Sequence, residues 1–266
     1  MEFAQRSVPV ETAAPSGRTN AYVLGDDPAL LVDPAGRTPD LDRLVADKRV
    51  EHVLVTHTHP DHVGALEYYA AETGATVWAR RPFVDRFRSV TGLEPDRLYG
   101  GDTTIDLGDD RVRILDAPGH APDHVALVAG VDGPILCGDC AVREGSVVVG
   151  APEGDLRAYL STLRRLRAID PPRLHPGHGP VIERPRETLE RLIAHRLARE
   201  RRVLEAVETG SRTLESVLEA AYEKDVSDVQ ELARATVRAH LEKLAVEGRV
   251  RWDGDLVCPV EGRDVR

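Results

Sequence analysis

Short apolar runs separated by turn signals occupy the first two thirds of the chain, with amphipathic stretches between them. Strands that alternate with helices and also pair as hairpins predict an α/β domain with its helices outside the sheets. A hairpin is predicted over residues 20–33, around Gly-Asp-Asp-Pro, and further strands over 52–57, 75–79, 112–117, 125–128, 134–137 and within 172–182. Helices are predicted over 41–48, from Pro60 to Gly74, and over 156–168.

The pattern becomes helical after Ile182. Helices are predicted over 186–209, over 213–222 with Ser211 as its cap, and over 229–247 with Ser227 as its cap. Two short strands around Asp253-Gly254 then predict a terminal hairpin. Three helices and a hairpin are the outline of a winged-helix-like α+β domain. We therefore expect two domains, residues 1–182 and residues 183–266.

Composition and charge narrow the classes of function. The chain has 266 residues with 30% charged groups and a net charge of −10, which disfavours a general nucleic-acid binder because phosphate contacts dominate such binding. No apolar run approaches the roughly 18 residues that cross a bilayer, and no export signal precedes the first predicted strand. Three cysteines make a disulfide framework improbable, so a cytoplasmic location is expected.

The stretch THTHPDH, which follows the predicted strand over 52–57, carries four candidate metal ligands. Imidazole nitrogens and carboxylate oxygens bind zinc when cysteine is not used, and manganese or iron can occupy similar donors. Because alternate residues of an extended segment project the same way, His57 and His59 can share one ion. Asp61 and His62 lie past the bend, where they can face a second ion.

Three more candidates follow strand-like runs, and each has a glycine directly before it: His120, Asp139 and His178. Glycine permits the close backbone approach that such loops need. The hypothesis is then a dinuclear site, in which two cations about 3.5–4 Å apart activate a shared water. One ion is assigned to His57, His59 and His120, the other to Asp61, His62 and His178, with Asp139 bridging.

The motifs THTHPDH, APGH, CGDC and PGHG, in this order, resemble those of the metallo-β-lactamase superfamily over roughly residues 20–182. The resemblance implies an αββα sandwich with two zinc ions per chain. Two residues differ from the motifs of particular branches of this superfamily. Asp139 stands where the best-known β-lactamases have cysteine, which disfavours antibiotic hydrolysis, and His59 stands where the flavodiiron branch has glutamate, which disfavours redox chemistry.

The stretches ILCGDCAVREGSVVVGAPEGDLRAYLSTLRRL, HPGHGPVI and HRLARERRVLEAV, followed by the predicted winged helix, resemble the β-lactamase-like protein 2 group over almost the whole chain. That group includes an endoribonuclease that cuts single-stranded RNA. This resemblance makes RNA phosphodiester cleavage by a metal-bound hydroxide the leading hypothesis. A glyoxalase II-like (thio)ester hydrolase, which shares THTHPDH, is the alternative. A nucleic-acid-binding regulator with a non-catalytic metal site is the third, although the complete ligand set opposes it.

Residues around the predicted ligands receive supporting roles. Asp61 is assigned a second role as a proton acceptor, as well as that of a ligand. Asp33 and Thr56 fit two roles equally well: they can support ligand histidines, or they can be ordinary turn or strand-end residues. His124, just after a ligand loop, is assigned to support or substrate contact.

Basic residues provide two further candidate surfaces. Arg80, Arg81 and Arg86 lie near Phe83 and Phe87 and could contact phosphates and bases, although a solvated surface over packed phenylalanines is slightly favoured. In the C-terminal segment, glutamates share the third predicted helix with its arginines. A role in substrate contact or homodimer formation is therefore favoured there over DNA recognition.

Overall fold

The first of two β-sheets contains six strands and is mixed. The computed structural model describes residues 1–222 and 229–260, so the predicted cap Ser227 lies outside the described residues. The sheet has the order β1-β2-β3-β4-β5-β6, antiparallel from β1 to β3 and parallel from β3 to β6. Its strands are β1 (Phe3–Pro9), β2 (Arg18–Gly25), β3 (Ala29–Val32), β4 (Val50–Leu54), β5 (Thr76–Arg80) and β6 (Arg97–Tyr99).

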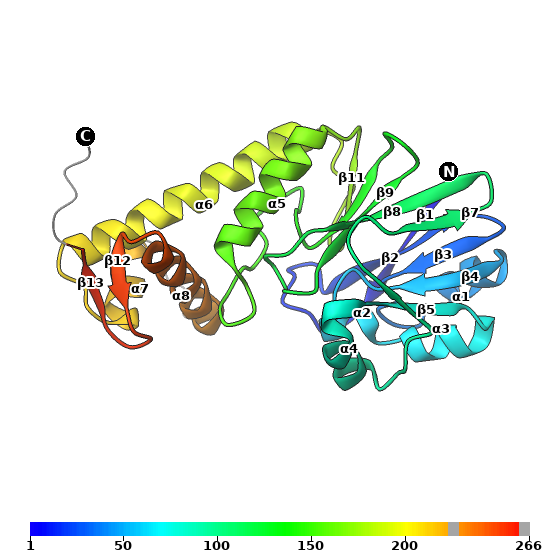
Figure 1. Ribbon diagram of the computed structural model, residues 1–266, viewed down its shortest axis with the longest axis horizontal. Helices are drawn as coiled ribbons and strands as arrows, with labels where there is room; N and C mark the ends of the chain where they lie inside the picture. The colour runs from blue at the N-terminus through cyan, green and yellow to red at the C-terminus, as the bar shows by residue number, and fades with distance from the viewer. Residues whose placement is uncertain (223–228, 261–266) are drawn as a thin grey trace. The chain divides into compact units, whose positions relative to one another are not determined.

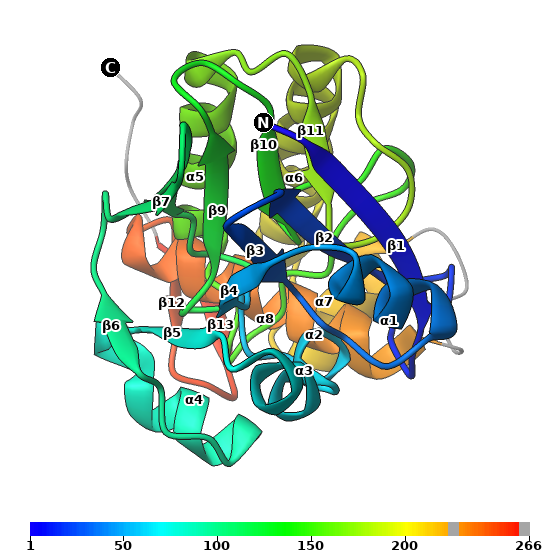
Figure 2. The ribbon, with the colours of Figure 1, turned by 90° about the vertical axis from the view of Figure 1, so that its right-hand side faces the viewer.

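The second sheet has five strands in the order β11-β10-β9-β8-β7, and only β10 and β11 pair in parallel. Figure 2 shows the strands of the two sheets as neighbouring layers. The strands are β7 (Thr104–Leu107), β8 (Asp110–Asp116), β9 (Val125–Ala129), β10 (Ile135–Gly138) and β11 (Leu174–Pro176).

Strand β3 of the first sheet is apolar on both faces because both of its faces are covered. Successive residues of a strand point to opposite sides of a sheet. Leu30 and Val32 of β3 therefore join the core shared with the second sheet, which includes Ile114 and Leu127. Leu31, between them, joins the core on the outer face. Helices of that outer layer are α1 (Pro39–Ala46), α2 (Pro60–Val63), α3 (Leu66–Thr73) and α4 (Val84–Thr91), the last preceded by the 3₁₀ turn η1 (Arg81–Phe83).

The single helix predicted from Pro60 to Gly74 is wrong, because the chain breaks it into α2 and α3. At the break, the Ala65 N–H donates to the Pro34 carbonyl at 2.8 Å. Gly64 lies so close to the Ala35 carbonyl oxygen that a Cβ would overlap it. Contacts with the segment that follows β3 therefore interrupt the helix at this point.

Two packing units divide the described residues by their contacts. The first comprises residues 1–117, 123–145 and 169–188, and the second comprises the remaining described segments, 118–122, 146–168 and those from 189 onward. The division does not follow one point in the sequence, because residues 118–122 and 146–168 pack with the C-terminal helices. The predicted boundary after residue 182 stays a prediction.

Four helices and a hairpin make up most of the second unit (Figure 1). Apolar residues of three helices and both hairpin strands form one cluster, which includes Val207, Leu218, Val237 and Val257. Ser211 was predicted to cap the second helix of this region, but the side chain of Thr213 accepts from the Ser216 N–H instead. The elements are α5 (Leu156–Ile169), α6 (Pro185–Glu208), α7 (Leu214–Ala221), α8 (Gln230–Val246), β12 (Val250–Trp252) and β13 (Val257–Pro259).

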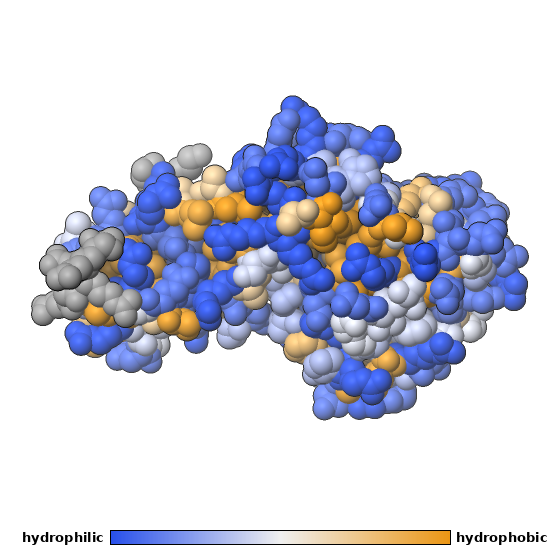
Figure 3. All heavy atoms as spheres, turned by 45° about the horizontal axis from the view of Figure 1, so that its top comes forward, coloured by the Kyte–Doolittle hydropathy of each residue, from blue (hydrophilic) through white to orange (hydrophobic). Residues whose placement is uncertain are grey.

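One face of the molecule is largely hydrophilic. On the face drawn in Figure 3, hydrophilic residues surround smaller hydrophobic areas, consistent with the charged fraction of 30%. Within the described ranges, no helix combines the length and the apolar composition that crossing a bilayer requires.

A shielded ion pair links α6 and α8. Lys243 Nζ lies 2.8 Å from Glu200 Oε2, and the two side chains are 8% and 15% exposed. The substitution Lys243→Ala should lower the free energy of unfolding by about 2–4 kcal/mol. It removes the cation that pairs with Glu200 and leaves that carboxylate largely buried and unpaired. Arg238→Ala breaks an exposed pair with Glu242 on the same helix and should cost no more than about 0.5 kcal/mol. Urea unfolding of both variants measures the difference, and equal costs would contradict this account.

The same pair should make stability sensitive to acid. Burial raises the pKa of Glu200, but His240 and Lys243 lower it by more, so its pKa lies below that of an ordinary glutamate. A lowered pKa stabilises the folded chain above the unfolded value of about 4.3, and this contribution is lost as the pH falls through the folded value. The gap in unfolding free energy between wild type and Lys243→Ala should therefore narrow from pH 7 to pH 3. A constant gap across these unfolding curves would rule out Glu200 as the titrating group.

Candidate metal centre

The segment between β4 and α2 directs two histidine rings to one point. His59 has the extended conformation of a helix N-cap residue, and Pro60 begins α2. His57 Nε2 and His59 Nδ1 lie 2.9 Å apart, and their ring centroids are 4.5 Å apart. Two basic nitrogens directed at one point are the arrangement that a shared cation requires.

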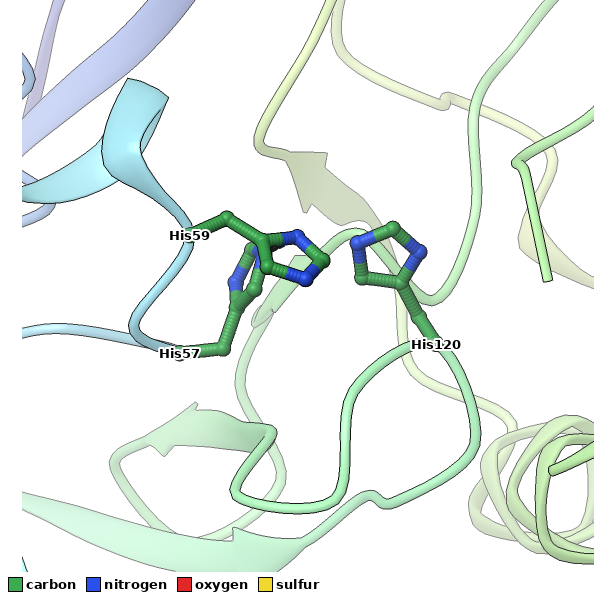
Figure 4. A group of neighbouring side chains, drawn as sticks. All are labelled: His57, His59 and His120. Carbon is green, nitrogen blue, oxygen red and sulfur yellow. Dashed lines mark hydrogen bonds between the residues drawn. The ribbon is translucent and has the colours of Figure 1, made fainter. Parts of the chain in front are cut away.

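All seven predicted ligands occur in groups of converging donor atoms. Within each group the donor atoms lie within 4.8 Å of one another. Figure 4 shows the His120 ring directed toward the rings of His57 and His59. The three groups are His57, His59 and His120; His57, His62 and Asp139; and Asp61, His62 and His178.

The glycine before each of three predicted ligands is required by close packing, as expected from the sequence. A Cβ at Gly177 would overlap Asp139 Oδ1, and one at Gly119 would overlap the backbone of Tyr159. Gly138 has a φ of 47°, and its Cβ would lie 2.7 Å from His124 Nε2. Larger residues at these positions would displace the neighbours of the site.

Four of the histidines are anchored through Nδ1. Three of the partners are carbonyl or carboxylate oxygens, which only accept hydrogen bonds, and the fourth is the Thr56 hydroxyl, whose own hydrogen is donated to Asp33. Each Nδ1 therefore carries the hydrogen. Nε2 of each ring is left as the basic atom. The pairs are His57 with Thr56 Oγ1 (3.1 Å), His62 with Asp33 Oδ2 (3.0 Å), His120 with the Val148 carbonyl (2.7 Å) and His178 with the Arg18 carbonyl (2.8 Å).

The three predicted support residues lie directly behind these rings. Asp33, buried and with a left-handed φ of 51°, accepts from the Thr56 N–H at 2.6 Å and the Thr56 hydroxyl at 2.8 Å. His124 Nε2 accepts from the Asp139 N–H at 2.9 Å. Together these contacts fix the backbone beside His57 and at Asp139.

The charges around the centre favour a cation. Burial lowers the pKa of His62, but the carboxylates of Asp33 and Asp139 raise it by more, to about 9. For His178, burial likewise lowers the pKa, and Asp139 raises it above the usual value. His62 Nε2 is buried and has no hydrogen-bond partner within residues 1–222 and 229–260. Imidazole and carboxylate donors around a buried, basic nitrogen therefore fit a metal ion.

Thr12 is a neighbour of the site that was not predicted from the sequence. Its hydroxyl donates to Asp61 Oδ2 at 2.6 Å, and the same oxygen lies 3.5 Å from His178 Nε2. Thr12 lies in the irregular segment after β1, and nothing in its local sequence distinguishes it from other polar loop residues.

The arginines proposed as substrate contacts are engaged within the protein. Arg80 Nη2 lies 2.9 Å from Asp116 Oδ1, and the Arg80 guanidinium lies over the Phe83 ring. Arg86 Nε donates to Thr58 Oγ1 at 2.8 Å. The exposed Arg81 reaches the Leu98 carbonyl at 3.5 Å. Phe87 is buried in the core on the outer face of the first sheet, so it cannot stack on a base.

Known proteins are similar in sequence to most of this chain. The profile of the family described as Metallo-beta-lactamase superfamily matches residues 14–178. Beta-lactamase-like protein 2 homolog of Drosophila melanogaster is 30% identical over 252 residues, which cover 88% of this chain and 84% of that protein. Atrochrysone carboxyl ACP thioesterase of Aspergillus fumigatus is 28% identical over 212 residues, which cover 76% of this chain and 64% of that protein.

Solved structures show the same architecture. TTHA1429 of Thermus thermophilus, described as a metallo-beta-lactamase family protein, matches with a TM-score of 0.77 at 24% identity, covering 97% of this chain and 98% of that chain. TTHA1623, solved in a di-iron-bound form, matches with a TM-score of 0.54 at 28% identity, covering 67% of this chain and 96% of that chain. The chain, with its two mixed sheets and its His/Asp groups, thus belongs to the metallo-β-lactamase superfamily, whose members are mostly metal-dependent hydrolases.

Proposed function

We propose that this protein is a hydrolase with a dinuclear metal centre. The observation that carries the proposal is the convergence of seven imidazole and carboxylate side chains, with the Nδ1 atoms of four rings anchored behind them. A solvated loop of polar residues would not need such anchoring.

His57, His59 and His120 would hold one ion, and Asp61, His62 and His178 the other. Asp139 would bridge, since it forms one group of converging donor atoms with His57, which is assigned to the first ion, and His62, which is assigned to the second. When bound, two such ions polarise the substrate and lower the pKa of a bound water. We propose zinc as the metal, since imidazole and carboxylate are its usual donors when cysteine is not used. Iron, which takes similar donors and is bound in the di-iron form of TTHA1623, is the main competitor.

Asp61 is the residue that we propose to accept a proton from the attacking water. Its side chain is 16% exposed, so its oxygens reach the solvent side of the centre. The Thr12 hydroxyl donates to Oδ2 of Asp61 at 2.6 Å, which restricts the orientation of the carboxylate. A positioned carboxylate of this kind contributes roughly 10²–10⁴-fold to a rate.

We propose a carboxylic ester or thioester as the substrate class. Single-stranded RNA was the leading hypothesis from the sequence because of the resemblance to the β-lactamase-like protein 2 group. Binding RNA beside the site would also require cationic groups and aromatic rings that are available to contact it. Arg80 and Arg86 are held by acidic or hydroxyl partners, and Phe87 is buried. The similarity to a thioesterase over 76% of the chain supports the same choice.

RNA stays the second candidate because the similarity to Beta-lactamase-like protein 2 homolog extends over 88% of the chain. Arg81 is exposed, and its contact with the Leu98 carbonyl is long, at 3.5 Å. Direct comparison of the two substrates therefore decides between the classes.

For the C-terminal segment we propose a winged-helix-like arrangement of helices and hairpin, serving substrate contact or dimer formation. The arginines of α8 are engaged by acidic residues: Arg234 Nη1 lies 2.7 Å from Glu215 and Arg238 Nε lies 2.9 Å from Glu242. Ion pairs of this kind oppose sequence-specific DNA recognition. We assign the catalytic role to residues 1–182 and the accessory role to residues 183–266.

Removing the proposed bridge tests the metal centre. Asp139→Ala should reduce bound metal from about two ions per chain to one or fewer, because both groups lose a shared oxygen. Asp132→Ala, an exposed aspartate on the loop before β10, is the matched control and should retain wild-type content. Elemental analysis after purification without chelator measures both variants. Unchanged content in Asp139→Ala would contradict the bridging assignment.

Turnover of two substrates tests the reaction. S-lactoylglutathione should be hydrolysed and a short single-stranded RNA left intact, with chelator abolishing the activity. Asp61→Ala should lower kcat by roughly 100-fold or more, because it removes the proton acceptor as well as a ligand. Chelator-sensitive RNA cleavage without thioester turnover would reverse the order of the two substrate classes. Turnover of neither substrate by metal-loaded protein would refute both.

A further inference from the structure

A buried carboxylate outside the predicted site holds the residue between His57 and His59. Asp123 is 4% exposed and precedes β9, while Thr58 is 3% exposed. Asp123 Oδ2 accepts from the Thr58 N–H at 3.0 Å and from the Thr58 hydroxyl at 2.7 Å. One oxygen therefore fixes both the backbone and the side chain of Thr58.

Arg86 of α4 completes this contact. Its Nε donates to the Thr58 hydroxyl at 2.8 Å and lies 3.7 Å from Asp123 Oδ1. The Thr58 hydroxyl thus accepts from Arg86 and donates to Asp123. A buried carboxylate is costly unless a nearby cation and hydrogen bonds offset its desolvation. Arg86 supplies that charge, which explains why it is directed inward rather than toward solvent.

The contact lies behind the two rings that direct nitrogen atoms at each other. Thr58 lies between His57 and His59 in the chain, and Asp123 holds both its N–H and its hydroxyl. Holding this one residue therefore restricts the backbone that carries both rings. Asp33 holds Thr56 through a similar pair of hydrogen bonds, since its carboxylate accepts from both the N–H and the hydroxyl of Thr56. Buried carboxylates thus hold the residues on both sides of His57.

We propose that Asp123 is a positioning residue for the metal centre, acting through Thr58, with Arg86 as its counterion. This inference rests on the proposed function, because it assigns His57 and His59 to a metal ion. Groups that orient metal ligands from behind commonly contribute about 10–100-fold in metal affinity when they are altered.

Two substitutions of Thr58 test the proposal through metal affinity. Thr58→Val keeps the shape but removes the hydroxyl that links Arg86 to Asp123, and it should weaken metal affinity about 10–100-fold. Thr58→Ser restores the hydroxyl and should remain within about threefold of wild type. Asp116→Asn, which removes the partner of Arg80 away from this contact, is the control and should leave affinity unchanged.

Affinity is measured by competition with a chelator, and the absorption spectrum of the Co²⁺-loaded protein reports ligand geometry. The spectrum should change in Thr58→Val and return to the wild-type form in Thr58→Ser. A purely structural role would lower the stability of metal-free Thr58→Val while leaving its affinity and spectrum unchanged, and that result would overturn the proposal.

Metal affinity tests the positioning role of Asp123 independently of the proposed hydrolytic reaction. Metal affinity can support the role of Asp123 even if neither test substrate is hydrolysed, which would refute only the proposed reaction. Wild-type protein that binds neither Zn²⁺ nor Co²⁺ would refute the metal centre and the positioning role together.

Discussion

Burial of imidazoles and carboxylates at one point is the constraint to which the rest of the structure conforms. Each buried polar group left without a partner costs about 1–3 kcal/mol, and charged groups cost more. The chain meets this cost by assigning an acceptor to Nδ1 of His57, His62, His120 and His178. Thr56, the acceptor for His57, lies within the histidine motif, but the acceptors for the other three rings come from separate parts of the chain. The directions of those three rings therefore depend on the tertiary fold.

Sheet geometry brings two of the proposed ligands together. β10 and β11 pair in parallel, Pro176 lies opposite Gly138, and the Gly177 N–H donates to the Gly138 carbonyl at 2.9 Å. Asp139 and His178 follow directly at the ends of these strands. The space that a side chain of residue 177 would fill is taken by Asp139 Oδ1. The glycines are therefore part of the donor geometry as well as of the turns.

Local patterns were sufficient to predict the apolar strands and the proposed ligands. The hairpin of β2 and β3 and the strands β4, β5 and β8 to β10 fall where β-branched and aliphatic runs occur. β1 was missed because its residues are mostly half-buried, so they show no apolar run, although it pairs with β2 from Phe3 opposite Leu24 to Pro9 opposite Arg18. Thr12 and Asp123 act across 49 and 65 residues of sequence, which no local pattern encodes.

Charge balance at the centre connects its construction to the substrate. In the proposed site, two divalent cations would face the carboxylates of Asp33, Asp61 and Asp139, and a hydroxide formed from the bound water would bring the sum of charges to zero. An uncharged ester or thioester would add no charge on binding, and the cations would stabilise the single oxyanion that develops on attack. An RNA segment brings a negative charge with every phosphate and requires further cationic groups. Arg80 and Arg86 do not supply them, because Asp116 and the Asp123–Thr58 contact already engage their charges. The contact that orients His57 and His59 thus also removes a cation from the candidate substrate surface, which links the positioning of the metal ligands to the choice of substrate.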